Sequence, residues 1–240
     1  MTNGFLRIAS VAPQHRVADV AYNVDRIIES LVELDSKKVE LAVYPELCIT
    51  GYTCGDLFHN ATLLNAAAAG LQRIREAVSE LNIHVIVGLP VRKAGGAVYN
   101  CAAFIRNNEC DIIEKTYLPS YNEFYERRWF SPSATPRTPR FFTSHGVKIG
   151  IEICEDLWVP VPPSCNDAMA GAQVICNLSA SDDLIGKHDY LVSLIRQQSA
   201  RCMCGYVYSS AGFGESTTDL VFLPKTIIAE CGPLLCENDR

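Results

Sequence analysis

Hydrophobic residues recur along this chain with the two periods that separate strands from helices. In residues 147–153 a valine or isoleucine stands at every second position, which is the pattern of a strand with one apolar face. In residues 20–34 the apolar positions instead follow helical spacing, behind Asp19 as a candidate helix cap. Residues 83–89 are apolar almost throughout, as expected of a strand buried on both faces.

The same patterns predict strands and helices over most of the chain. The expected helices cover residues 19–36, 61–81, 165–170 and 187–202. The expected strands cover residues 5–12, 39–44, 83–89, 97–105, 110–114, 147–153, 174–177, 205–210, 219–223 and 226–230. Residues 107–108 are expected to form a hairpin turn, and residues 116–139 an irregular loop.

This alternation of strands and helices is typical of an α/β protein whose helices cover its sheets. No linker, repeat or shift in composition divides residues 1–240. We therefore expect a single domain.

Composition excludes several classes of protein. The 240 residues are 48% hydrophobic and 20% charged, with a net charge of -6, which is ordinary for a globular protein. Because Lys and Arg form no continuous run, we expect neither a nucleic-acid partner nor binding to an anionic membrane. No apolar run approaches the roughly 20 residues that span a bilayer, and the first residues lack the layout of a signal peptide. We expect a soluble, cytoplasmic protein.

The count of eleven cysteines is high. Their odd number and the lack of a secretion signal indicate reduced thiols in a cytosol rather than a disulfide framework. No C-x-x-C pair occurs, because Cys202 and Cys204 are separated by one residue only. We therefore expect no metal site, and most of these thiols are expected to fill the core.

Cys154 differs from the other cysteines in its place, because it directly follows the predicted strand 147–153. Glu46 and Lys115 also follow predicted strands, and strand ends are the usual location of active sites in α/β sheets. These side chains can together break an amide: Glu46 takes the thiol proton, Cys154 attacks the carbonyl, and Lys115 stabilises the oxyanion together with a backbone N–H near residue 155. The alternative from spacing alone is a loop cap, a surface charge and a core thiol.

A cysteine–histidine pair is the rival chemistry. No histidine of this chain lies in a recognisable family signature. His84 lies in an apolar predicted strand, where we expect a hydrogen-bonded core residue. A serine triad and a nucleotide loop are less favoured, because the chain contains neither a G-x-S-x-G elbow nor a Walker A loop.

Three segments around these residues resemble the catalytic segments of the nitrilase (carbon–nitrogen hydrolase) superfamily. They are Pro-Glu-Leu-Cys-Ile-Thr-Gly-Tyr at 45–52, Lys-Thr-Tyr-Leu-Pro-Ser-Tyr-Asn-Glu-Phe-Tyr-Glu-Arg-Arg-Trp-Phe at 115–130, and Gly-Ile-Glu-Ile-Cys-Glu-Asp-Leu-Trp at 150–158. Within the superfamily, the chain is similar to the N-terminal glutaminase domain of glutamine-dependent NAD synthetases. That narrower resemblance rests on residues 51–58, on residues 177–181 together with 186–187, and on residues 216–220.

The resemblance implies an α/β fold built as a four-layer αββα sandwich. It implies a catalytic triad of Glu46, Lys115 and Cys154. The implied reaction is hydrolysis of the glutamine side-chain amide to glutamate and ammonia through a cysteine thioester, and it needs no cofactor and no metal.

The resemblance also suggests supporting residues. Glu123 matches a second glutamate that supports the triad in some members, whereas Glu126, beside Arg127 and Arg128, is expected to form a surface ion pair. Which of the two glutamates supports the triad stays open. The implied contacts with glutamine are Tyr52, Tyr121, Phe124, Glu155, Ser181 and Lys187.

Synthetases of this kind carry a second, ATP-dependent domain that uses the ammonia to convert deamido-NAD to NAD. The Ser-Gly-Gly-x-Asp-Ser loop of that domain does not occur in this sequence. ATP and Mg would therefore belong to a synthetase domain that acts in cis or in trans, and homo-oligomerisation is also implied. Two alternatives stay open: a free-standing amidase of another small amide or carbamoyl compound, and a non-catalytic or partner-dependent assembly module.

Overall fold

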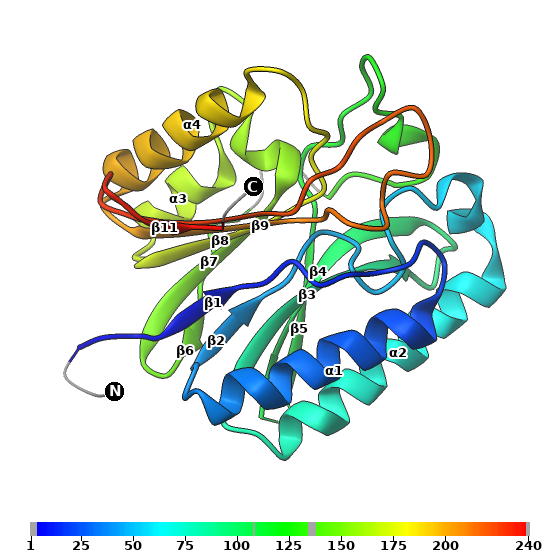
Figure 1. Cartoon of the computed structure of the whole chain (residues 1–240), viewed down its shortest axis with the longest axis horizontal. Helices are drawn as coiled ribbons and strands as arrows, with labels where there is room; N and C mark the ends of the chain where they lie inside the picture. The colour runs from blue at the N-terminus through cyan, green and yellow to red at the C-terminus, as the bar shows by residue number, and fades with distance from the viewer. Residues whose placement is uncertain (1–3, 108, 134–137, 239–240) are drawn as a thin grey trace.

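Two β-sheets lie face to face at the centre of the molecule, and helices cover the outer side of each sheet (Figure 1). The computed structural model describes residues 4–107, 109–133 and 138–238. The layers follow the order helix, sheet, sheet, helix, which confirms the expected αββα sandwich. Sheets that are apolar on both faces require such cover on both sides.

The first sheet has five strands in the order β1-β2-β3-β4-β5. Their bounds are β1 Ile8–Ser10, β2 Leu41–Val43, β3 His84–Arg92, β4 Val98–Arg106 and β5 Glu109–Glu114. Strands β1, β2 and β3 are parallel, and β3, β4 and β5 pair antiparallel. Helices α1 (Val20–Ser36) and α2 (Ala61–Ser79) form the crossovers that parallel pairing requires, and they cover the outer face.

Helix α1 begins and packs as its sequence predicts. The Asp19 side chain accepts a hydrogen bond from the Tyr22 backbone N–H at 3.1 Å, which satisfies a donor that the first turn leaves unpaired. Val24, Ile27 and Leu31 are buried on one side of the helix. This apolar stripe holds α1 against the first sheet.

The second sheet has six strands in the order β11-β10-β9-β8-β7-β6. Their bounds are β6 Phe142–Ser144, β7 Val147–Ile153, β8 Val174–Ser179, β9 Gly205–Ser210, β10 Lys225–Glu230 and β11 Leu234–Glu237. The parallel strands β7, β8 and β9 are linked by α3 (Pro163–Met169) and α4 (Lys187–Cys202). Short 3-10 turns are η1 Gly55–His59, η2 Glu126–Arg128 and η3 Cys154–Leu157.

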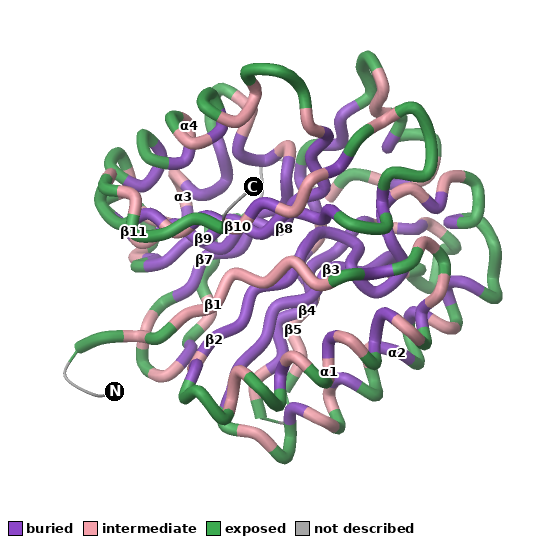
Figure 2. The backbone as a smooth tube through the Cα atoms, in the orientation of Figure 1, coloured by how far each residue is buried: buried purple, intermediate pink, exposed green. Residues whose placement is uncertain are grey.

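The apolar layer between the sheets fixes one sheet against the other. Val43 and Phe104 of the first sheet pack in one cluster with Ile151, Leu178 and Val207 of the second. Figure 2 shows the central strands β2, β3, β4, β7, β8 and β9 as largely buried. Each such side chain contributes about 1.5–3 kcal/mol when fully buried. This layer therefore sets where the ends of strands from different sheets meet.

Several expectations are met closely and others are wrong. Helix α4 and strand β9 begin and end at the predicted residues. The expectation for His84 is confirmed, because its Nδ1 lies 2.9 Å from Ser144 Oγ in a buried setting. The short strands β6 and β11 were not predicted, and Asn108 of the expected hairpin turn lies outside the described residues.

Residues 219–223 do not form the expected strand. They contribute an isolated bridge between Asp182 and Phe222. Phe222 is buried, and its ring centroid lies 6.2 Å from that of Tyr52. The apolar residues of this segment therefore pack against the core from a loop. The sequence pattern alone cannot distinguish such a loop from a strand.

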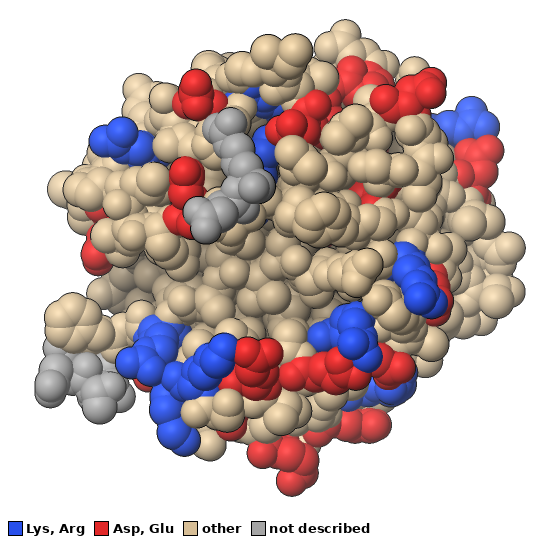
Figure 3. Space-filling model, in the orientation of Figure 1, with Lys and Arg blue, Asp and Glu red and all other residues tan. Residues whose placement is uncertain are grey.

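The surface carries charges of both signs. On the face drawn in Figure 3, Lys and Arg are interspersed with Asp and Glu along the helix layer of the first sheet, and Arg73 of α2 pairs with Asp25 of α1 at 2.7 Å. Within the described residues, no helix is both long and apolar enough to cross a membrane. The same part of the chain contains no group of three or more His, Cys, Asp or Glu side chains arranged to hold a metal ion.

Candidate active site

Three side chains from strand ends lie close together inside the molecule. Glu46 lies in the turn after β2, Lys115 directly follows β5, and Cys154 directly follows β7. Glu46 and Lys115 are each 1% exposed, and Cys154 is 7% exposed. Glu46 and Lys115 come from the first sheet and Cys154 from the second. The packing of the two sheets therefore places the charges of Glu46 and Lys115 close enough to affect the pKa of the thiol.

The turn that carries Glu46 lies directly against β3. A side-chain carbon at Gly88 would lie 2.2 Å from the Leu47 nitrogen and 2.6 Å from the Pro45 oxygen, so only glycine allows this approach. On the other side, the Glu46 N–H donates to the Ser179 carbonyl at 3.2 Å. The backbone of Glu46 is thereby held between the two sheets.

The Glu46 carboxylate has three hydrogen-bond donors. Oε1 accepts from Lys115 Nζ at 2.6 Å and from Asn100 Nδ2 at 2.7 Å, and Oε2 accepts from the Ala180 backbone N–H at 3.0 Å. Bonds of this kind fix the plane of a carboxylate. Residues of both sheets therefore fix the orientation of the Glu46 carboxylate. The contacts with Asn100 and Ala180 were not predicted from the sequence.

A second buried carboxylate contacts Lys115. Glu126 Oε1 accepts from Lys115 Nζ at 2.6 Å and from the Tyr52 hydroxyl at 2.9 Å. Glu126 is fully buried. One ammonium group is therefore shared between the carboxylates of Glu46 and Glu126.

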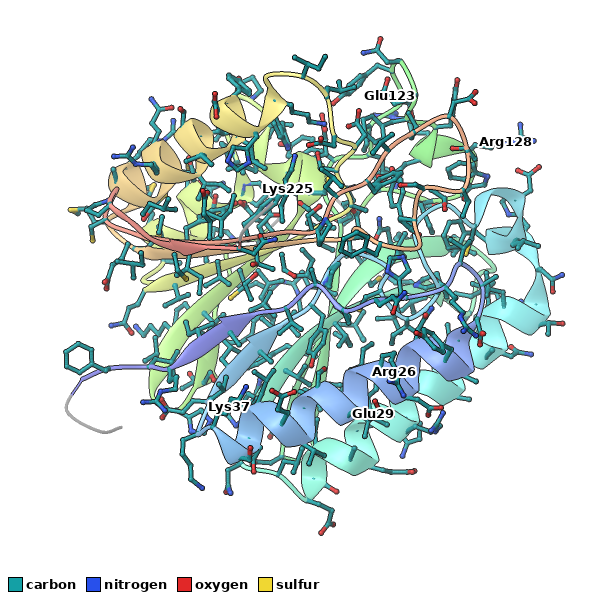
Figure 4. All side chains as sticks on the ribbon, viewed as in Figure 1. Arg26, Glu29, Lys37, Glu123, Arg128 and Lys225 are labelled. Carbon is teal, nitrogen blue, oxygen red and sulfur yellow. The ribbon has the colours of Figure 1, made fainter. Side chains whose placement is uncertain are left out.

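The expectation that Glu126 forms a surface ion pair is wrong. Glu126 does not form a surface ion pair, because turn η2 directs it inward while Arg128 pairs with Asp56 at 2.8 Å. Glu123 lines the cavity described below and does not take the place beside Lys115. Figure 4 shows Glu123 and Arg128 near the periphery of the molecule. The only sequence signal for Glu126 was its presence in the segment after Lys115.

Burial and mutual charge set the protonation of this group. Burial alone would lower the pKa of Lys115, but the carboxylates of Glu126 and Glu46 raise it well above its ordinary value. Burial raises the pKa of Glu126 to about 7, against the opposing effect of Lys115. Lys115 is therefore an ammonium ion, and Glu126 titrates near neutral pH.

Tyr52 is held in place by a buried carboxylate that the sequence did not reveal. Both carboxylate oxygens of Glu215 accept from the Tyr52 backbone N–H at 2.8 Å, and Gly51 provides the turn with φ +88°. The Tyr52 ring lies edge-on to Phe124, with centroids 6.5 Å apart. The Tyr52 hydroxyl donates to Glu126 Oε1, and Tyr52 is not among the residues that line the cavity described below.

The backbone at Cys154 turns sharply. Its φ of +46° lies in the left-handed region, which is uncommon outside glycine and often marks a functional residue. Asp156 fixes the turn, because its carboxylate accepts from the Ile153 N–H at 3.0 Å and from the Tyr117 N–H at 2.9 Å. The rigid strand and this turn together orient the thiol.

The surroundings keep the Cys154 thiol protonated. Burial raises its pKa first, and the negative charge of Glu46 raises it further, whereas Lys115 lowers it. A thiolate is the nucleophilic form of cysteine. This thiol therefore needs a base at the moment of attack. Glu46 is the candidate, because its charge acts on the thiol more strongly than that of Glu126.

A cavity of about 210 Å³ opens onto Cys154. Tyr121, Phe124, Glu155, Ser181 and Lys187, which the sequence pointed to, line this cavity together. Its other lining residues are Pro119, Asn122, Glu123, Trp158 and Leu184. A larger hollow of about 630 Å³ lies beyond Leu184 and does not include Cys154 among its lining residues, so the smaller cavity is the candidate site.

The wall of the cavity carries both signs of charge. The Tyr121 hydroxyl donates to Glu155 Oε2 at 2.8 Å, and burial raises the pKa of Glu155. Lys187 pairs with the buried Asp182, and its Nζ lies 5.9 Å from the ring centroid of Phe124. The site thus presents a carboxylate, an ammonium and aromatic faces around a thiol.

Comparisons with known proteins show the family of this chain. The model of the carbon-nitrogen hydrolase family matches residues 7–239. The glutamine-dependent NAD(+) synthetase of Mycobacterium tuberculosis is 36% identical over an alignment 255 residues long. The alignment covers 99% of this chain and 37% of the relative. The chain thus spans little more than a third of the length of that relative.

Solved structures share the fold. A glutamine-dependent NAD(+) synthetase from Cytophaga hutchinsonii matches with a TM-score of 0.86 and 29% identity, over 98% of this chain and 40% of that one. A nitrilase-superfamily amidase from Nesterenkonia matches with a TM-score of 0.85 over 97% of this chain and 86% of that one, and at 19% identity it shows the fold alone. The resemblance read from the sequence is confirmed, and this chain belongs to the carbon-nitrogen hydrolase family.

Proposed function

We propose that this chain hydrolyses the side-chain amide of glutamine to glutamate and ammonia through a thioester on Cys154. The observation that carries the proposal is the buried Lys115–Glu46 pair, 2.6 Å apart, beside a thiol on a left-handed turn that opens onto a small cavity. The carboxylate can serve as the base, the ammonium can stabilise the oxyanion, and the thiol can act as the nucleophile of amide cleavage. The Mycobacterium tuberculosis relative, named a glutamine-dependent synthetase, supports glutamine as the amide.

In the proposed mechanism, Glu46 accepts the proton of the Cys154 thiol as the sulfur attacks the amide carbon. The carbonyl oxygen becomes an oxyanion, and Lys115 stabilises its charge. Glu46 then donates the proton to the leaving nitrogen, so that ammonia departs and a thioester remains. In the second half Glu46 takes a proton from water, the hydroxide attacks the thioester, and the proton returns to the thiol as glutamate leaves.

In this mechanism, Glu126 supports the lysine rather than touching the substrate. Lys115 must keep its proton while the neighbouring Glu46 changes charge. Glu126, 2.6 Å from the same ammonium, supplies a second negative charge when it is ionised. This raises the affinity of Lys115 for its proton, which is what a stabiliser of the oxyanion needs.

The charges of the cavity support an α-amino acid as substrate. We assign Glu155 to the α-ammonium group of glutamine and Lys187 to its α-carboxylate, since the two side chains carry the complementary charges. Tyr121 holds Glu155 by a hydrogen bond at 2.8 Å. Phe124 and Ser181, which also line the cavity, are assigned to contacts with the aliphatic part and the amide.

The ammonia would be used by an ATP-dependent synthetase domain that makes NAD from deamido-NAD. The support is that matched synthetases extend far beyond the part that this chain covers. That domain would act in cis or in trans in the cytoplasm and would hold ATP and Mg. No step of the proposed amide hydrolysis passes through either, and self-association into a homo-oligomer is part of the same proposal.

Ammonia release from glutamine tests the proposal. The wild-type chain should release ammonia from glutamine and Cys154→Ala should not, and a diazo-ketone analogue of glutamine should add its mass at Cys154 alone. Robust turnover of another small amide, with none of glutamine, would instead favour a free-standing amidase. Negligible turnover that rises when a synthetase domain is added would favour a partner-dependent module.

A further inference from the structure

Away from the candidate active site, α3 packs against α4 (Figure 1). Three thiols lie close together in this region. Cys165 lies on α3, Cys202 is the last residue of α4, and Cys204 lies in the turn to β9. All three are free. A single amide nitrogen, Gln198 Nε2, lies 3.4 Å from the sulfurs of both Cys165 and Cys202. The two sulfur atoms therefore lie on the same side-chain amide.

The three thiols differ in acidity. Hydrogen bonds from Cys204 and Cys165 lower the pKa of Cys202 to about 7, with burial opposing them and Arg201 adding to them. Burial raises the pKa of Cys165, and the hydrogen bond to Cys202 together with burial raises that of Cys204. Cys202 is therefore the thiol that is partly ionised at neutral pH, and the thiolate is the form that attacks oxidants.

Cys165 and Cys204, the two possible disulfide partners of Cys202, differ in their exposure to solvent. Cys165 and Cys202 are half-buried, whereas Cys204 is 2% exposed. Cys165 and Cys202 are therefore both more accessible to an oxidant than Cys204. The deeply buried Cys48 and Cys176 have raised pKa values because of burial and lie in a setting that protects thiols.

We propose that Cys202 is a peroxide-reactive thiol and that Cys165 resolves it into a reversible disulfide that joins α3 to α4. The Cys202 thiolate attacks hydrogen peroxide, the O–O bond breaks, and the products are a sulfenic acid and hydroxide, which takes up a proton to become water. The Cys165 thiol then attacks the sulfenic sulfur, the S–S bond forms, and a second water leaves. The two thiols lose two electrons and the peroxide gains them.

The disulfide would act on the layer that supports β7. Gln198 Nε2 also donates to Ser164 Oγ at 2.8 Å, and the Ser164 N–H donates to Glu152 Oε2 at 3.0 Å. Glu152 lies on β7, the strand that ends before Cys154. The S–S bond fixes α3 to α4, and the cross-link limits the freedom of the unfolded chain.

Mass spectrometry after mild peroxide treatment tests the proposal. The wild-type chain should lose the mass of two hydrogens, the linked peptides should contain Cys165 and Cys202, and dithiothreitol should restore the original mass. The melting temperature of the oxidised chain should rise by about 5 °C. Cys165→Ser should instead accumulate a sulfenic acid at Cys202 that a dimedone probe traps.

Two further variants complete the test. Cys202→Ser should abolish the disulfide, and Cys236→Ser, which changes an exposed thiol on β11, should leave it unchanged. A disulfide that maps to Cys202 and Cys204 would overturn the role of Cys165. Oxidation of Cys236 or Cys231 while Cys202 remains reduced would overturn the proposal, and neither result depends on whether the chain hydrolyses glutamine.

Discussion

Lys115 Nζ lies 2.6 Å from Glu126 Oε1, the same distance that separates it from Glu46 Oε1. Two buried carboxylates therefore share one ammonium, and their negative charges repel each other. Glu126 can relieve this repulsion by taking up a proton, because burial raises its pKa to about 7. The protonation of Glu126 thus sets the charge that Glu46 experiences near neutral pH.

Replacing Glu126 with glutamine should remove a pH dependence from hydrolysis. The wild-type kcat/KM should rise as the pH increases through about 7, since ionised Glu126 holds the proton on Lys115, which stabilises the oxyanion. Glu126→Gln keeps the shape without the charge, so the rise should vanish and the plateau should fall about 10- to 100-fold. Glu109→Gln, which changes an exposed glutamate on β5, is the matched control and should keep both features. An unchanged rise in Glu126→Gln would assign the titration to another group.

The same carboxylate predicts a trend in folding stability. The folded-state pKa of Glu126 is raised from its ordinary value of 4.5, so protonated Glu126 contributes stability that is full below 4.5 and is lost as the pH rises through about 7. The free energy of unfolding of the wild type should therefore fall more steeply across this window than that of Glu126→Gln. Urea titrations on either side of the window measure the difference, and equal slopes for the two proteins would contradict the assignment.

Cys154→Ala should reduce ammonia release from glutamine by on the order of 10³-fold or more, because it removes the nucleophile. The fold should survive, since the loss of one buried sulfur costs about 1–2 kcal/mol. Cys176→Ala is the matched control: Cys176 is a fully buried thiol on β8. It should lose similar stability and keep its activity. Ammonia release and melting curves on both variants separate the chemical role of Cys154 from its packing role.

The features that the sequence predicts well are local. Residues 187–202 repeat apolar positions at helical spacing, and residues 147–153 alternate at the period of a strand, so α4 and β7 follow from neighbours along the chain. The places of Glu46, Lys115 and Cys154 after strands follow in the same way. Whether these three side chains lie together depends on how the two sheets pack. The resemblance to the family's motifs predicted that they do.

Glu126 shows why the rest was not predicted. A glutamate followed by two arginines has the same pattern whether it faces solvent or the core. Its inward direction is decided by turn η2, which Arg128 and Trp129 anchor through hydrogen bonds to Asp56, more than 70 residues earlier in the chain. Contacts between segments so distant leave no periodic signal, and the packing of Phe222 on Tyr52 has the same cause.

Glu155→Gln should raise KM for glutamine by about 10-fold or more with a smaller change in kcat. The charge of Glu155 is assigned to the α-ammonium group, which is bound equally in the ground state and the transition state. Tyr121→Phe removes the hydrogen bond that orients Glu155 and should give a weaker effect of the same kind. A simple aliphatic amide without an α-amino group is the control substrate, and its kcat/KM should not change. A parallel loss with that substrate would place Glu155 in the chemistry itself.

Gly88→Ala should weaken both the fold and the hydrolysis, because the turn of Glu46 leaves no room for a side chain. The new carbon would lie 2.2 Å from the Leu47 nitrogen, so the backbone must shift, at an expected cost of about 2–4 kcal/mol. That shift displaces the base, and kcat should fall more than 10-fold. Gly95→Ala in the β3–β4 hairpin meets nothing within 4 Å and should change the free energy of unfolding by less than about 0.5 kcal/mol. If kcat of Gly88→Ala matched that of Gly95→Ala, the close approach of β3 would not be what positions Glu46.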